Sequence, residues 1–176
     1  MTTPNYMAQL GATLVDRGFP ILPIQPRSKK PGMYRQGAWH DYPKWSRHCE
    51  RATTENEVDI WGDWPESGIG IAAGRVIGID IEIRPHNRAA IEAHPLSDRI
   101  TLIEGSSTAP EIVAQVKSLV KPGETVLVIL DSNHTYAHVA DELEAYAGLV
   151  TQGSYIVATD GIMHDLADVP RGHPGW

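Results

Sequence analysis

Short apolar runs alternate with helical stripes of apolar residues through the first third of the chain. Gly18 follows one such stripe and is expected to end a helix there. Thr54 and Glu57 form a capping-box pattern, which predicts a helix start. We therefore expect, in order, a helix over 6–17, a strand over 21–24, a loop rich in proline, glycine and basic residues over 26–48, and a helix over 54–61.

Two further apolar runs, 69–73 and 76–83, are separated only by Gly74 and Arg75. A parallel crossover needs about a dozen residues or more. If these two runs pair with each other, they therefore form an antiparallel hairpin.

From residue 76 the apolar pattern becomes regular. It predicts strands over 76–81, 100–104, 125–130 and 154–159, and helices over about 86–94, 109–120 and 135–147. Ser107 or Thr108 is expected to cap the second of these helices, with Pro110 in its first turn. Strands that alternate with helices indicate a parallel sheet with right-handed crossovers. The expected class is α/β: a partial Rossmann-like parallel sheet with flanking helices, preceded by a small irregular N-terminal segment with an antiparallel hairpin.

Three of the predicted strands end in a carboxylate, at Asp80, Asp131 and Asp160, and His134 follows closely after the second. In open α/β sheets, ligands bind at the carboxyl ends of the strands. The pattern therefore favours a ligand site at that edge. The alternative is that Asp131 and Asp160 only cap the helices that follow their strands.

Charge and composition differ between the two halves of this 176-residue chain of net charge −7. Residues 1–75 hold nine basic and eight acidic side chains, whereas residues 76–176 hold six and fourteen. An acidic second half is a poor general surface for nucleic acid and suits a cation or a small ligand better. Cys49 is the single cysteine, and no apolar run approaches ~18 residues, so we expect a cytoplasmic protein without a membrane span.

Residues 75–176 closely resemble the cephalosporin hydroxylase/rhamnosyl O-methyltransferase family. The resemblance lies in the stretches RVIGIDIEIRPHNRAAIEAHPL, ITLIEGSS, VLVILDSNHTYAHV and SYIVATDGIMHDLADVPRG. The resemblance implies the class I S-adenosylmethionine-dependent methyltransferase fold and methyl transfer to a hydroxylated small molecule or sugar.

The same resemblance implies roles for individual residues. Asp80 would hydrogen-bond the ribose of S-adenosylmethionine, and Ser106 and Ser107 would lie near its adenine. Asp131 and Asp160 would hold Mg²⁺, since neighbouring strands lie only about 4.8 Å apart. His134 stands where related metal-dependent methyltransferases place a general base.

The chain also departs from the family pattern. The family's first strand and its glycine-rich loop should precede Arg75, but the helix that should follow that loop has no residues to form it. Thr159 stands where many relatives place a second acidic residue. The cofactor pocket is therefore expected to be incomplete within this chain.

Residues 8–82 resemble the start of a bifunctional primase–polymerase domain, through GFPILPIQPRSKKP, WGDWPESGIGIAAG and IGIDIE. That resemblance implies that Asp80 and Glu82 bind metal for nucleotidyl transfer, and that the basic residues of 27–30 meet phosphates of a nucleic acid. The chain is then a fusion of two partial domains, 1–75 and 76–176. A third interpretation is an inactive hybrid of the two.

Overall fold

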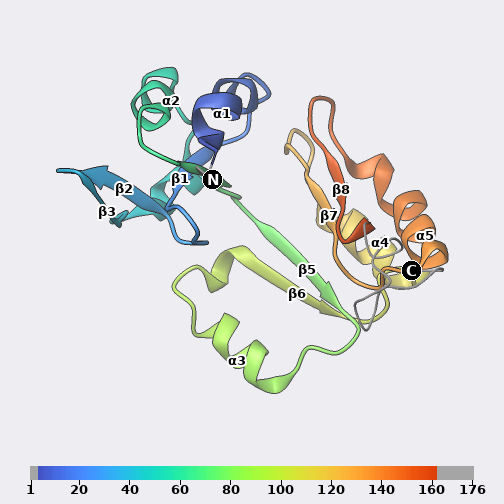
Figure 1. The fold of residues 1–176 in the computed structure, drawn as a ribbon. Coiled ribbons are helices and arrows are strands. Elements are labelled where there is room, and N and C mark those ends of the chain that lie inside the picture. Colours follow the sequence, from blue (N-terminus) through green and yellow to red (C-terminus); the bar gives the residue numbers. More distant parts are fainter. Residues whose placement is uncertain (1–3, 162–176) are drawn as a thin grey trace, which may run out of the picture. The chain divides into compact units, whose positions relative to one another are not determined.

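The chain divides into two compact units, with the boundary in the sequence between Gly74 and Arg75 (Figure 1). The computed structural model describes residues 4–161. The division falls beside the change in charge and composition at residue 75.

The first unit combines two helices with two antiparallel strand pairs. Its elements are α1 (Tyr6–Asp16), β1 (Ile21–Ile24), β2 (Gly32–Arg35), β3 (Ala38–Asp41), the 3-10 helix η1 (Trp45–Glu50), α2 (Glu55–Gly62) and β4 (Gly68–Ile71). Strand β1 pairs with β4 and β2 with β3.

The expected loop over 26–48 is wrong, because it contains the β2–β3 hairpin and η1. Gln36 and Gly37, the two residues between the strands, both have positive φ. This is the backbone of the tight turn that suits a two-residue hairpin. The prediction failed because the two strands are only four residues each and lack a clear apolar alternation.

The start of α2 confirms the capping box. The Thr54 side chain accepts a hydrogen bond from the Glu57 N–H, and the Glu57 carboxylate accepts one from the Thr54 N–H at 3.0 Å. The Arg51 guanidinium donates to the same carboxylate at 2.8 Å. The hydrogen bond from Arg51 is the main reason that the pKa of Glu57 falls from 4.5 to about 2.

Replacing Glu57 by Gln should destabilise the first unit by about 1 kcal/mol at neutral pH, since it removes a charged capping contact in a partly exposed pair. Because the folded pKa is depressed, this stability is present above pH 4.5 and is lost as the pH falls toward 2. The difference between E57Q and the parent should shrink over that range. Denaturant unfolding followed by tryptophan fluorescence reports this unit, which holds four of the five tryptophans.

Glu55, in the same first turn of α2, provides the matched control. We expect E55Q to leave the pH profile of unfolding unchanged. An equal pH dependence in E57Q and the parent would contradict the assigned role of Glu57.

The second unit alternates strands and helices and confirms the expected α/β class, with parallel strand pairs flanked by helices (Figure 1). Its elements are β5 (Val76–Asp80), α3 (Pro85–Glu92), η2 (Ser97–Arg99), β6 (Ile100–Glu104), α4 (Pro110–Leu119), β7 (Val128–Leu130), α5 (Tyr136–Tyr146), η3 (Ala147–Leu149) and β8 (Ile156–Ala158). Strand β5 pairs with β6, and β7 with β8.

Two expectations about strand pairing need correction. The runs 69–73 and 76–83 do not pair with each other, because β4 pairs with β1 and β5 with β6. Over residues 4–161, β5–β6 and β7–β8 also form two separate two-stranded sheets rather than one. Alternation of strands and helices indicates parallel pairing, but it does not fix which strands are neighbours.

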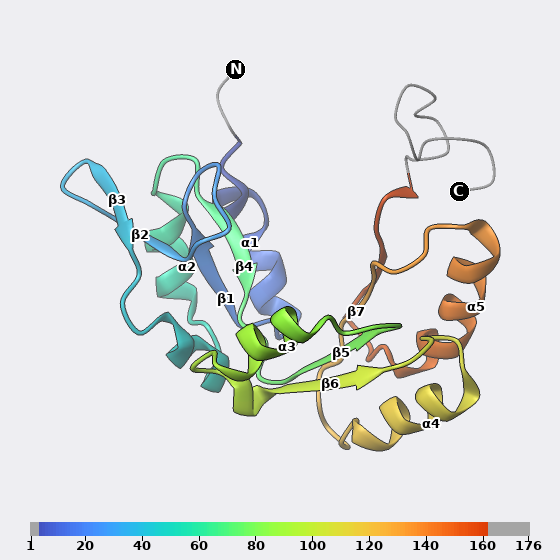
Figure 2. The ribbon, with the colours of Figure 1, turned by 90° about the horizontal axis from the view of Figure 1, so that it is seen from below.

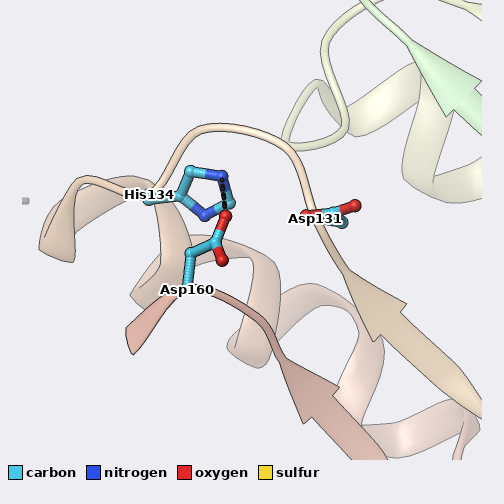
Figure 3. Close-up of side chains that lie close together, drawn as sticks. All are labelled: Asp131, His134 and Asp160. Atoms are coloured by element: carbon cyan, nitrogen blue, oxygen red, sulfur yellow. Dashed lines mark ion pairs between the residues drawn. The ribbon is translucent and has the colours of Figure 1, made fainter. Parts of the chain in front are cut away.

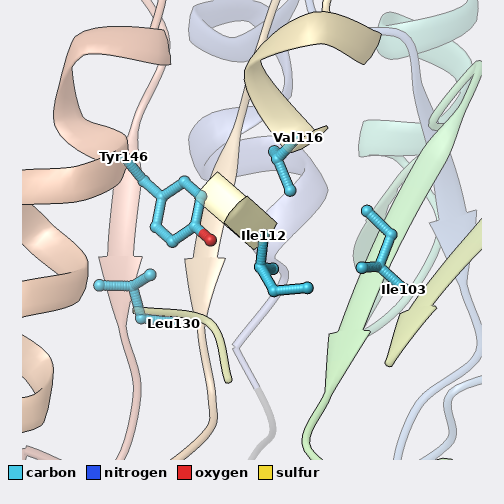
Figure 4. Close-up of a cluster of buried hydrophobic side chains, with 5 residues drawn as sticks. All are labelled: Ile103, Ile112, Val116, Leu130 and Tyr146. Atoms are coloured by element: carbon cyan, nitrogen blue, oxygen red, sulfur yellow. The ribbon is translucent and has the colours of Figure 1, made fainter. Parts of the chain in front are cut away.

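A shared core nevertheless joins both strand pairs of the second unit. Ile103 of β6 and Leu130 of β7 belong to one buried cluster with Ile112 and Val116 of α4 and Tyr146 of α5 (Figure 4). Helices α4 and α5 lie close together in both views of the ribbon (Figure 2). The two strand pairs and these two helices thus share one buried core. Over residues 4–161, none of the helices combines the length and apolar character that crossing a bilayer requires.

Candidate functional site

Parallel pairing places the strand ends of each pair at a common edge. Asp80 at the end of β5 is the register partner of Glu104 at the end of β6. Asp131 directly follows β7, and Asp160 comes two residues after β8. Each pair thus carries acidic residues at its carboxyl edge.

Asp131, His134 and Asp160 lie together at the edge of the β7–β8 pair (Figure 3). One ligand atom from each lies within 4.8 Å of the other two. The His134 Nε2 and Asp160 Oδ2 atoms are 3.4 Å apart. The structure therefore brings the neighbouring residues Asp131 and His134 together with Asp160, which follows a different strand.

The local backbone explains how these side chains are held. The Thr159 hydroxyl donates to the Asp131 Oδ1 atom at 2.6 Å, which orients that carboxylate. Asp160 has a left-handed φ of 55°, which Asp tolerates better than most residues, so the chain turns at this point. Helix α5 begins after Thr135 without a side-chain cap, so Asp131 does not cap it.

The three side chains suit a divalent cation. Carboxylate oxygens are hard ligands, and imidazole is a common ligand for transition metals. Ligand atoms about 2.1 Å from one ion lie at most about 4.2 Å apart, so a small rotation of the exposed aspartates would close the site. Two carboxylates this close also repel each other unless a positive charge lies between them.

Asp80 lies at the other strand pair, beside the loop that follows β6. The Gly105 N–H donates to the Asp80 carbonyl at 2.9 Å. The Asp80 Oδ1 atom accepts from the Glu82 N–H at 3.1 Å, so the chain turns directly after β5. Glu82 therefore lies in the turn beyond β5 and not in the strand that ends at Asp80.

Ser106 and Ser107 follow β6 but have different partners. The Ser106 hydroxyl lies 3.1 Å from the Thr108 hydroxyl. The Ser107 hydroxyl donates to the Glu142 Oε1 atom at 2.5 Å, and the Tyr146 hydroxyl donates to the Ser107 carbonyl. The expected cap of α4 by Ser107 or Thr108 is wrong: the cap position is Ala109, and its helix lacks a side-chain cap.

Glu142 is a residue that the sequence interpretation missed. It is 2% exposed and accepts hydrogen bonds from both Ser107 and Ser132. His138, Glu142 and Tyr146 recur every fourth residue, so they share one face of α5. This four-residue spacing was the signal in the sequence that could have pointed to Glu142. The same spacing is also typical of a helix face exposed to solvent.

Gly105 allows the sharp exit from β6 toward this loop. Its φ of +148° is rare for residues with a side chain, and an added Cβ would lie 2.8 Å from the Ile112 Cδ1 atom. We expect G105A to destabilise the second unit by about 1–3 kcal/mol, because it combines backbone strain with a clash in the core. Thermal unfolding followed by circular dichroism measures this.

Gly148 offers the matched control, since an added Cβ there meets nothing within 4 Å and its φ is not positive. G148A should unfold like the parent. Equal stability of G105A and G148A would contradict the steric role of Gly105.

The parallel strand pairs and the acidic carboxyl edge are those of a methyltransferase-like α/β protein. Sequence comparison agrees, because the profile of the Rhamnosyl O-methyltransferase/CmcI family matches residues 67–176. The chain belongs to this family.

Curated relatives extend the comparison. A protein named Rhamnosyl O-methyltransferase from Mycobacterium leprae is 32% identical over 99 residues, covering 55% of this chain and 41% of the relative. Proteins of the same name from Mycobacterium bovis and Mycobacterium tuberculosis are 33% identical over 78 residues, covering 43% of this chain and 31% of each relative. The chain thus spans well under half the length of these relatives. No solved structure matches significantly.

These comparisons support the methyltransferase half of the sequence interpretation. They do not support the resemblance of residues 8–82 to a primase–polymerase domain, because the family match begins at residue 67 and runs through the strand that both resemblances had claimed. The fusion hypothesis therefore has no support from them.

Proposed function

We propose that this chain carries the cofactor and cation edge of an S-adenosylmethionine-dependent O-methyltransferase that acts on a hydroxylated small molecule or sugar. The observation that carries the proposal is the convergence of Asp131, His134 and Asp160 in a member of this family. The names of the mycobacterial relatives favour a sugar hydroxyl as the methyl acceptor.

In this proposal, the β5–β6 pair would bind the cofactor and the β7–β8 pair would bind the cation. Asp80 would accept hydrogen bonds from the ribose hydroxyls, and Ser106 would lie near the adenine. Asp131 and Asp160 would hold the cation, either Mg²⁺ or another divalent ion. When bound there, the cation supplies Lewis acidity that lowers the pKa of a substrate hydroxyl.

His134 would act as the general base. Its Nε2 atom lies 3.4 Å from Asp160 and so borders the cation position. It would take the proton from the substrate hydroxyl while the oxygen forms its new bond to the methyl carbon. S-adenosylmethionine, when bound, would supply that methyl group, and S-adenosylhomocysteine would be the leaving group that keeps the electron pair of the broken bond to sulfur.

Calorimetric titration with S-adenosylmethionine and Mg²⁺, followed by a transfer assay with a labelled methyl group and rhamnose-containing acceptors, tests this proposal. We expect binding of both ligands and incorporation of label into the acceptor. A parallel titration with a nucleoside triphosphate tests the nucleotidyltransferase alternative. Binding of the nucleotide alone would contradict the proposal. If neither S-adenosylmethionine nor the nucleotide binds, the result would favour an inactive chain.

A further inference from the structure

A buried carboxylate connects the two strand ends that the proposed function uses. Glu142 lies on α5 with its side chain 3% exposed. Its Oε1 atom accepts from the Ser107 hydroxyl at 2.5 Å and from the Ser132 hydroxyl at 2.7 Å. Ser107 belongs to the loop after β6, and Ser132 directly follows Asp131 at the end of β7.

Other groups on α5 strengthen the hold on Ser107. The His138 Nε2 atom lies 3.2 Å from the Ser107 hydroxyl and 3.4 Å from the Glu142 Oε1 atom. The Tyr146 hydroxyl donates to the Ser107 carbonyl at 2.5 Å. The side chain and the backbone of Ser107 are both held by α5, and the proton of its hydroxyl is donated to Glu142. Ser106, one residue earlier, is left as the closer candidate for contact with the cofactor.

The two loops need such a connection because, within residues 4–161, no strand hydrogen bonds join β5–β6 to β7–β8. Hydrogen bonds between charged and hydroxyl groups in a buried setting are stronger than exposed ones. The Glu142 Oε2 atom is buried without a hydrogen-bond partner, which is costly. Because burying this oxygen without a partner destabilises the fold, we expect the Glu142 carboxylate to have a role besides packing.

We propose that Glu142 is a positioning residue that ties the loop carrying Ser106 and Ser107 to the strand end carrying Asp131. This aligns the cofactor loop with the cation site and couples binding at one to binding at the other. The inference rests on the proposed function for what the two loops bind. The connection itself depends only on the hydrogen bonds of Glu142.

Glu142→Met tests the connection, because it keeps a long unbranched side chain and removes the acceptor. We expect hydrogen–deuterium exchange to rise in residues 105–109 and 131–135 together, with little change over α3. Glu142→Gln keeps one oxygen that can accept from both serines and should preserve most of the protection. Ser132→Ala is a milder variant that removes one of the two hydrogen bonds, and it should loosen the same segments less.

Binding experiments test the coupling with S-adenosylhomocysteine as the probe. In the parent, saturating Mn²⁺ should tighten its binding about 5-fold or more, as expected for coupled sites. In E142M this factor should fall to about 1, and E142Q should restore it. Glu144→Met, at an exposed position on the same helix, should leave both the exchange and the coupling unchanged.

The outcomes separate this inference from the proposed function. A uniform rise of exchange throughout the second unit, or a rise in only one of the two loops, would overturn the positioning role. Coupling that persists in E142M would do the same. If the parent binds no S-adenosylhomocysteine, the proposed function fails, and the exchange pattern still decides whether Glu142 joins the loops.

Discussion

Replacing Asp131 by Asn should weaken divalent-cation binding by at least about 100-fold. Even residues that only support metal ligands typically contribute 10–100-fold to affinity, and Asp131 offers a direct ligand atom. The change keeps the size of the side chain and an oxygen that can still accept from Thr159, so folding should be preserved. Calorimetric titration with Mg²⁺ and with Mn²⁺ measures the effect.

Asp141 provides the control for this prediction, since it is an exposed aspartate on α5 outside the three-residue cluster. D141N should bind both cations like the parent. Parent-like affinity in D131N would remove Asp131 from the site, and equal losses in both variants would indicate a general effect of surface charge.

Replacing His134 by Gln should slow methyl transfer by about 10²–10⁴-fold if the imidazole is the general base. Glutamine keeps a polar group near Asp160 but cannot accept a proton at neutral pH. The rate of the variant should also lose the pH dependence that an ionising base imposes. Cation affinity should change far less than in D131N, because both aspartates remain.

This comparison separates a base from a metal ligand, two roles that the geometry around His134 allows. His86, exposed on α3, is the control, and H86Q should transfer methyl groups at the parent rate. A large loss of cation affinity in H134Q would show that the imidazole is a ligand rather than the base.

Much of the second unit could be predicted from sequence, because its strands are short apolar runs bounded by glycine, proline and acidic residues. The order of strands and helices was predicted correctly, and so was the α2 capping box at Thr54 and Glu57. Pairing partners were harder. Adjacent runs suggested a hairpin at residue 74, whereas β4 finds its partner in β1, some fifty residues earlier. Such long-range pairing depends on tertiary packing that local patterns do not encode.

The candidate site, too, could be predicted from the sequence only in part. Carboxylates at strand ends could be located because parallel strands share an edge, and the structure brings Asp131, His134 and Asp160 together as that argument requires. The hydroxyl of Ser107 could not be assigned, because its partner Glu142 lies 35 residues away. The roles of all six predicted site residues stay predictions until ligands are bound.

The central claim is that Asp131 and Asp160 hold one cation at the carboxyl edge of β7 and β8, beside His134. Anomalous diffraction from crystals soaked in Mn²⁺ tests it most directly. We predict an anomalous peak between the three side chains, about 2.1–2.3 Å from an oxygen of each aspartate. A peak elsewhere, with these carboxylates unbound at saturating Mn²⁺, would contradict it.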